Sequence, residues 1–153
     1  MPERAPYQTL LAFDFGLKQI GVAYGQTLTS SARGLSIVKA SDGIPNWDNL
    51  KALIDEWKPN LLLVGLPLNM DGSESDLSHL ARKFARRLHG RFTIEVLMVD
   101  ERLTSRDVKS SLIDENINAG GKRKTRDLSK IDHLAAALIL QNWLDNPQLG
   151  QQA

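Results

Sequence analysis

The sequence contains no cysteine, which excludes disulfide bonds and cysteine-ligated zinc. Its longest apolar stretches, such as Leu61–Val64, are far too short to span a membrane. The first residues, Met1–Tyr7, lack the apolar segment of a secretion signal, so we expect a cytoplasmic protein with no membrane partner. A formal net charge of only +1 argues against a polycationic protein that coats nucleic acid through bulk charge.

Several catalytic signatures are missing as well. There is no Walker A sequence and no dinucleotide-binding fingerprint. Asp14–Gly16 spells the metal-binding triplet of protein kinases, but the glycine-rich loop and the catalytic loop of kinases are absent. The histidines, His79, His89 and His133, follow no zinc-ligand spacing and accompany no nucleophile elbow. The sequence therefore argues against kinases, P-loop hydrolases and serine hydrolases.

The composition that remains is that of an ordinary globular domain. Hydrophobic residues make up 42% of the 153 residues and charged residues 24%. No internal repeat, linker or change in composition divides the chain. We therefore expect a single domain over residues 1–153, with an ordered core from about 8 to 146 and flexible termini.

The order of the predicted elements indicates a mixed α/β sheet. Three glycine-punctuated strands, at Thr9–Phe15, Ile20–Tyr24 and Gly34–Val38, predict an antiparallel meander, with a turn at Ser41–Pro45. Helical and strand patterns then alternate: a helix at 50–57, a strand at 61–66, a helix at 77–88, a strand at 94–99, a helix at 104–113, a loop at 114–127 and a helix from 128. This order predicts a five-stranded sheet, with three antiparallel strands followed by two parallel ones and helices on both faces.

Acidic residues stand at the ends of several predicted elements. Asp14 interrupts an apolar strand, where a buried carboxylate needs a cationic partner, a hydrogen-bond network or a metal. Asp100 and Glu101 follow a strand at the edge where α/β sheets gather ligands. Asp132 begins the last helix, and the small residues Ala135–Ala137 would let that helix approach Asp14.

Such carboxylates suit a divalent metal site. Mg²⁺ prefers carboxylate and water oxygens, and two ions about 3.5–4 Å apart can activate water and stabilise the leaving oxygen of a phosphodiester. Asp14 is the candidate to bridge them. Each residue also has an ordinary alternative: Asp132 could complement the helix dipole and Asp100 could be an N-cap. The spacing leaves the choice between Asp100 and Glu101 open.

Four segments of the chain resemble the YqgF family, whose members are described as Holliday junction resolvases and as pre-16S ribosomal RNA nucleases. The segments occur in register and are Asp14–Ala23, Val64–Ser73, Asp100–Ser105 and Ile131–Ala136. The resemblance extends from about Leu10 to Leu144. It implies a ribonuclease H-like fold and a catalytic, metal-binding triad of Asp14, Glu101 and Asp132 with Mg²⁺ or Mn²⁺. It thereby selects Glu101 over Asp100.

The resemblance also implies substrate contacts near the triad. Gly65, Asn69 and Gly72 would line a groove, although a tight turn explains them equally well. Gln19 stands where the family commonly has arginine, which leaves Lys18, Arg102 and Lys130 to contact the scissile phosphate. Further cations gather in two basic runs, which could equally be solvated surfaces: Arg82, Lys83, Arg86, Arg87 and Arg91, and then Lys122, Arg123, Lys124 and Arg126.

The favoured hypothesis is a metal-dependent endonuclease that processes precursor 16S ribosomal RNA, with structured RNA or a pre-ribosomal particle as its partner. A Holliday junction resolvase acting on branched DNA is the alternative, and a stable homodimer would support it; the sequence leaves monomer and homodimer open. A non-catalytic nucleic-acid-binding assembly protein is a third hypothesis. An actin-like phosphotransferase would need a second domain for which the chain has no room.

Overall fold

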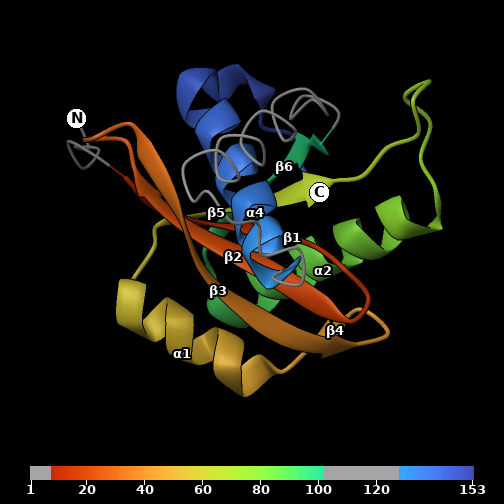
Figure 1. Ribbon diagram of the computed structural model, residues 1–153, viewed down its shortest axis with the longest axis horizontal. Coiled ribbons are helices and arrows are strands. Elements are labelled where there is room, and N and C mark those ends of the chain that lie inside the picture. Colours follow the sequence, from red (N-terminus) through yellow and green to blue (C-terminus); the bar gives the residue numbers. More distant parts are fainter. Residues whose placement is uncertain (1–7, 102–127) are drawn as a thin grey trace, which may run out of the picture.

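The computed structural model describes residues 8–101 and 128–153, with side chains in the last segment described from residue 134 (Figure 1). It consists of one curled sheet with helices on both faces. The sheet order is β4-β3-β2-β1-β5-β6. The strands are β1 (Thr9–Asp14), β2 (Gln19–Gln26), β3 (Ser31–Ser41), β4 (Ile44–Pro45), β5 (Leu61–Leu66) and β6 (Glu95–Asp100). The helices are α1 (Trp47–Trp57), α2 (Asp76–Phe92) and α4 (Leu128–Asp145), followed by the short 3-10 helix η2 (Pro147–Leu149).

The strand directions match the predicted mixed sheet. The strands from β1 to β4 pair antiparallel in sequence order, whereas β5 is parallel to β1 and β6 is parallel to β5. The difference is a sixth strand, β4, where the sequence predicted only a turn. Asp42 and Gly43 have φ angles of 52° and 83°, which make a tight hairpin connection that lets β4 fold back on β3.

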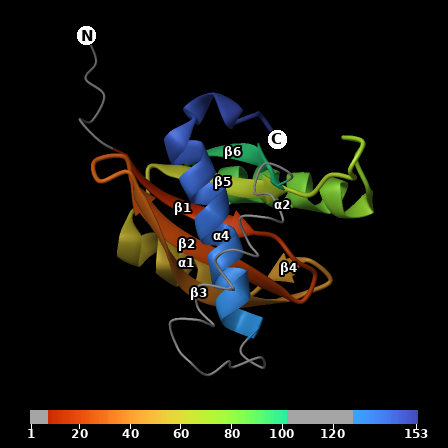
Figure 2. The same ribbon diagram turned by 45° about the horizontal axis from the view of Figure 1, so that its top comes forward.

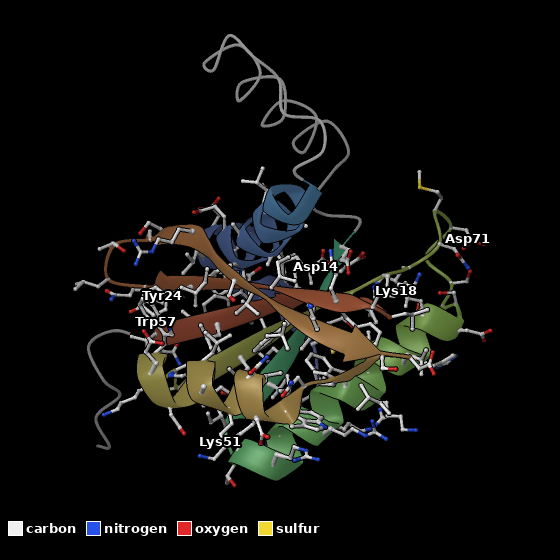
Figure 3. The ribbon with its side chains drawn as sticks, turned by 60° about the horizontal axis from the view of Figure 1, so that its bottom comes forward. Asp14, Lys18, Tyr24, Lys51, Trp57 and Asp71 are labelled. Atoms are coloured by element: carbon white, nitrogen blue, oxygen red, sulfur yellow. The ribbon has the colours of Figure 1, made fainter. Side chains whose placement is uncertain are left out.

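Alternation along the strands sends side chains into two separate cores. Phe13, Val64 and Met98 belong to the core that α1 and α2 cover. Ala12 and Leu63 directly precede Phe13 and Val64 in their strands. They therefore point to the opposite face and belong to the core beneath α4. Figures 2 and 3 show α4 crossing one face of the sheet while α1 and α2 cover the other. Because β1 and β5 are buried on both faces, their sequences are continuously apolar rather than alternating.

The close approach of α4 to the sheet depends on small residues on both sides. The small residues Ala135–Ala137 were predicted to allow this approach, and Ala135 and Ala136 are buried while Ala137 is partly buried. On the sheet side, a Cβ added to Gly25 of β2 would lie 2.7 Å from Cδ2 of Leu140. A glycine in the strand therefore makes room for a leucine of the helix. This packing holds the helix that carries Asp132 against β2, the strand paired with the one that carries Asp14.

Leu140→Ala should loosen this helix. Leu140 is fully buried, so its truncation should lower the free energy of unfolding by about 2–5 kcal/mol. Chemical denaturation followed by circular dichroism measures the change. Leu144→Ala, at a partly buried position on the same helix, is the matched control and should cost less. Equal losses for the two variants would contradict this account of the packing.

The C-terminal tail, predicted to be flexible beyond about residue 146, pairs with the edge of the sheet in this structure. After η2, Gln151 and Met98 exchange two backbone hydrogen bonds of 2.9 and 2.7 Å. These bonds cover part of the outer edge of β6, which would otherwise expose unpaired backbone groups. The helix predicted at 104–113 and the loop at 114–127 lie outside the described residues. Among the helices that are described, none is both long and apolar enough to cross a membrane.

Candidate active site

Two acidic residues lie at the same edge of the sheet. Because β1, β5 and β6 run parallel, their carboxyl ends meet there. Asp14 is the last residue of β1, and Asp100 is the last residue of β6, with Glu101 directly after it. Figure 3 labels Asp14 at this edge, on the side of the sheet that α4 covers. Asp100 and Glu101 therefore lie at the carboxyl edge of the parallel strands, as predicted, and Asp14 lies at the same edge.

Strand alternation separates Asp100 from Glu101. Leu97 and Val99 pack in the core beneath α4, so Glu101 continues their face of β6. Asp14 continues the same face of β1, two residues after Ala12. Asp100 follows Met98 on the opposite face and is only 7% exposed. The α4 face thus holds Asp14 and Glu101, and Asp100 is directed into the other layer.

Gly65 creates the space that the Glu101 side chain occupies. Gly65 pairs with Val99 and lies on β5, the strand between β1 and β6. A Cβ added to Gly65 would lie 2.7 Å from Oε2 of Glu101 and 2.6 Å from Cδ1 of Ile139. The side chain of Glu101 therefore reaches across β5, toward the strand that carries Asp14. Gly65 is buried and packs closely against these side chains, and its contact with substrate stays a prediction.

The turn after β1 forms a shallow pocket beside Asp14. The pocket measures about 370 Å³ and is lined by residues 14–19. Gly16 is required for the turn, since a Cβ there would lie 2.5 Å from the carbonyl oxygen of Gln19. Lys18 is exposed and is the cation among the lining residues. Its place beside Asp14 suits the predicted phosphate contact, and Gln19 adds no charge there (Figure 3).

The segment between β5 and α2 forms an ordered arm. Leu68 and Glu74 form a β-bridge, and the Asn69 amide donates a 2.9 Å hydrogen bond to Oγ of Ser73. Gly72 has a φ of 91°, which is the tight-turn requirement that the sequence analysis offered as an alternative. Asn69 thus holds the arm together, while Met70 near its tip is 84% exposed. Figure 3 labels Asp71 on this projecting segment.

Two contacts anchor the arm to α2. Arg82 donates hydrogen bonds to both carboxylate oxygens of Glu74, the shortest being 2.7 Å. These bonds lower the pKa of the Glu74 carboxyl below its usual value. At the other side of the arm, Ser78 donates a hydrogen bond to the carbonyl oxygen of Pro67. The guanidinium of Arg82 is therefore engaged in an ion pair with Glu74.

The remaining predicted site residues are only partly described. Asp132 and Lys130 belong to α4, but their side chains lie outside the described set. Arg102, Lys122, Arg123, Lys124 and Arg126 lie outside the described residues altogether. The described side chains include no cluster of three acidic or histidine ligands. The oxygen donors of Asp14 and Glu101 nevertheless suit a hard divalent cation, for which Asp132 stays the predicted third ligand.

The sheet order and the helices on both faces define a ribonuclease H-like fold of the kind found in Holliday junction resolvases. The structure of Thermus thermophilus RuvC bound to a Holliday junction aligns with a TM-score of 0.54 at 14% identity, covering 95% of this chain and 99% of that one. The yeast mitochondrial Holliday junction resolvase Ydc2 aligns with a TM-score of 0.53 at 13% identity, covering 88% and 77%. At these identities the likeness concerns the fold.

The chain belongs to the RuvX family, described as Holliday junction resolvase, whose sequence model matches residues 8–146. This confirms the resemblance to the YqgF family. A relative from Histophilus somni is 50% identical over 143 residues, which cover 94% of this chain and 98% of the relative. One from Haemophilus ducreyi is 51% identical over 138 residues, covering 90% and 96%. Both carry the name "Putative pre-16S rRNA nuclease".

Proposed function

We propose that this protein is a metal-dependent endonuclease that processes precursor 16S ribosomal RNA. The observation that carries the proposal is the placement of Asp14 and Glu101 on one face, at the shared carboxyl edge of parallel strands, with Gly65 between them. Ligands gather at this edge in α/β sheets. Relatives at about half identity, matched over nearly their whole length, carry the name "Putative pre-16S rRNA nuclease", which supports this substrate.

Asp14 and Glu101, with Asp132 from α4, would hold one or two Mg²⁺ or Mn²⁺ ions. When bound, these ions lower the pKa of a coordinated water and stabilise charge on the phosphate oxygens. Asp14 ends a buried strand and is itself only partly exposed, so its carboxylate is held in place before substrate arrives. Lys18, exposed in the adjacent pocket, would draw the phosphate toward this edge.

Recognition would depend on backbone and shape. The cations at 102, 122–126 and 130 belong to this proposal as phosphate contacts. Such contacts orient a nucleic acid without reading its sequence. Structured RNA is recognised largely in this way, through phosphates and helix shape. The same contacts suit branched DNA, and the family's description as a Holliday junction resolvase keeps that as the second candidate function.

A direct comparison of the two polymers tests the proposal. The purified protein would be given a precursor 16S ribosomal RNA fragment and a four-way DNA junction in parallel, each with Mg²⁺, with Mn²⁺ or with a chelator. We expect metal-dependent cutting of the RNA and little cutting of the junction. Cutting of the junction alone would select the resolvase activity. Binding of either polymer without cutting under any metal would support a non-catalytic assembly protein.

A further inference from the structure

A second pocket lies on the helical layer opposite α4. It measures about 600 Å³ and lies between α1, β4 and the C-terminal half of α2. Its lining residues, called here the α2 basic pocket, are Ile44, Trp47, Arg87, Gly90 and Arg91. The guanidinium of Arg91 lies 4.0 Å from the centroid of the Trp47 ring, in a cation–π contact that holds it in place. The site is thus partly apolar and carries two arginines.

The charges of the α2 basic pocket are available to a ligand. Lys83, Arg87 and Arg91 recur every four residues along α2, so they share one side of the helix. Within the described part of the chain, none of the three forms an ion pair, in contrast to Arg82 with its partner Glu74. The neighbouring elements also present exposed acidic residues, Asp42 before β4 and Asp48 in α1, but these pair with none of the three cations.

The β3–β4 hairpin connects this pocket to the turn beside Asp14. The amide of Gly43 donates a 2.9 Å hydrogen bond to the carbonyl oxygen of Leu17, which lines the Asp14 pocket. A Cβ on Gly43 would lie only 2.9 Å from Cζ of Phe15, so the two turns are in direct contact. The next residue, Ile44, lines the α2 basic pocket. The turn beside Asp14 and the α2 basic pocket are therefore joined through the β3–β4 hairpin, which contacts the first and lines the second.

We propose that the α2 basic pocket binds the sugar–phosphate backbone of the RNA substrate at a distance from the scissile bond. The ligand is a polyanion because the two arginines of the pocket lie on one side of a helix and have no acidic partner among the described residues. This inference rests on the proposed nuclease function, because the ligand it names is the substrate of that function. It assigns a role to α2 residues that lie outside the predicted catalytic edge.

Gly90 provides a test that leaves the fold intact. A Cβ added to Gly90 meets nothing within 4 Å, and Gly90 has no positive φ. Replacing a glycine inside a helix with a longer residue also favours the helix. Gly90→Glu would add a carboxylate to the lining that holds Arg87 and Arg91, whereas Gly90→Gln has nearly the same shape without the charge. Both variants should therefore melt at or above the wild-type temperature.

Binding is measured in an Asp14→Asn background, by fluorescence anisotropy of a labelled RNA stem-loop with a single-stranded extension. We expect Gly90→Glu to weaken binding about 3- to 10-fold and to reduce the slope of log K against log salt by about 1. Gly90→Gln should stay within about twofold of its Gly90 parent. Equal affinities of the Glu and Gln variants would overturn the proposal and would leave the pocket to an acidic protein partner.

The same measurement separates this proposal from the proposed function. If the protein with an intact site binds RNA but cuts neither RNA nor DNA, the nuclease assignment fails while the Glu and Gln variants can still differ in affinity. If cutting is observed, the α2 basic pocket predicts a higher KM for Gly90→Glu with kcat unchanged, because the altered contact lies away from the scissile bond. A fall in kcat at unchanged KM would contradict a remote backbone contact.

Discussion

Asp14→Asn should abolish cleavage, with a fall in rate of at least about 10³-fold. Asparagine keeps the shape of the side chain but removes the negative charge that a divalent cation needs. Asp14 ends β1 on the face covered by α4, and that strand would fold as before. The variant should therefore keep its thermal stability while losing metal-dependent cutting and most of its Mn²⁺ affinity, which calorimetric titration measures.

Asp100→Asn is the matched control for this experiment. Asp100 lies at the same edge of the sheet, next to Glu101, but on the face turned away from α4. If alternation along β6 decides which carboxylate acts, this variant should retain cleavage within a few fold below its own unfolding temperature. Loss of Mn²⁺ binding in Asp100→Asn with none in Asp14→Asn would show that the metal lies on the other face.

Gly65→Ala should reduce cleavage by about 10²-fold or more through a single added methyl group. That methyl would fall 2.7 Å from Oε2 of Glu101 and 2.6 Å from Cδ1 of Ile139. Both contacts are too close for van der Waals packing, so the carboxylate must move away from its place over β5. The fall should be in kcat, together with weaker Mn²⁺ binding, because the change concerns the position of a metal ligand.

Two further variants separate the carboxylate from general overpacking. Ile139→Val should relieve the apolar collision in Gly65→Ala, and the double variant should recover stability lost to overpacking, typically about 1–3 kcal/mol. It should not recover kcat or Mn²⁺ affinity, since the collision with Glu101 remains. Ile139→Val alone controls for the lost methyl group. Full recovery of activity in the double variant would show that Gly65 serves packing beneath α4 and does not position Glu101.

Local pattern was enough to predict most of the fold. The strands β1, β5 and β6 were predicted from short apolar runs, and the amphipathic spacing of 77–88 predicted most of α2. The short strand β4 was missed because a two-residue strand has no periodicity of its own and depends on pairing with β3. The backbone bonds between Gln151 and Met98 were missed for a similar reason, since they join residues that lie far apart in the sequence.

The sequence by itself determined which residue types stand at the ends of the elements, and resemblance to known relatives selected Asp14, Glu101 and Asp132 among them. The sequence already implied that the side chains of the consecutive residues Asp100 and Glu101 point to opposite faces of the sheet. Which of the two shares a face with Asp14 depends on which helices cover each face. Only the tertiary structure decided that Glu101 shares the α4 face with Asp14 and reaches over Gly65. The physical reason is that residues 65 and 101 meet through the pairing of β5 with β6, and no local pattern encodes a contact between separate strands.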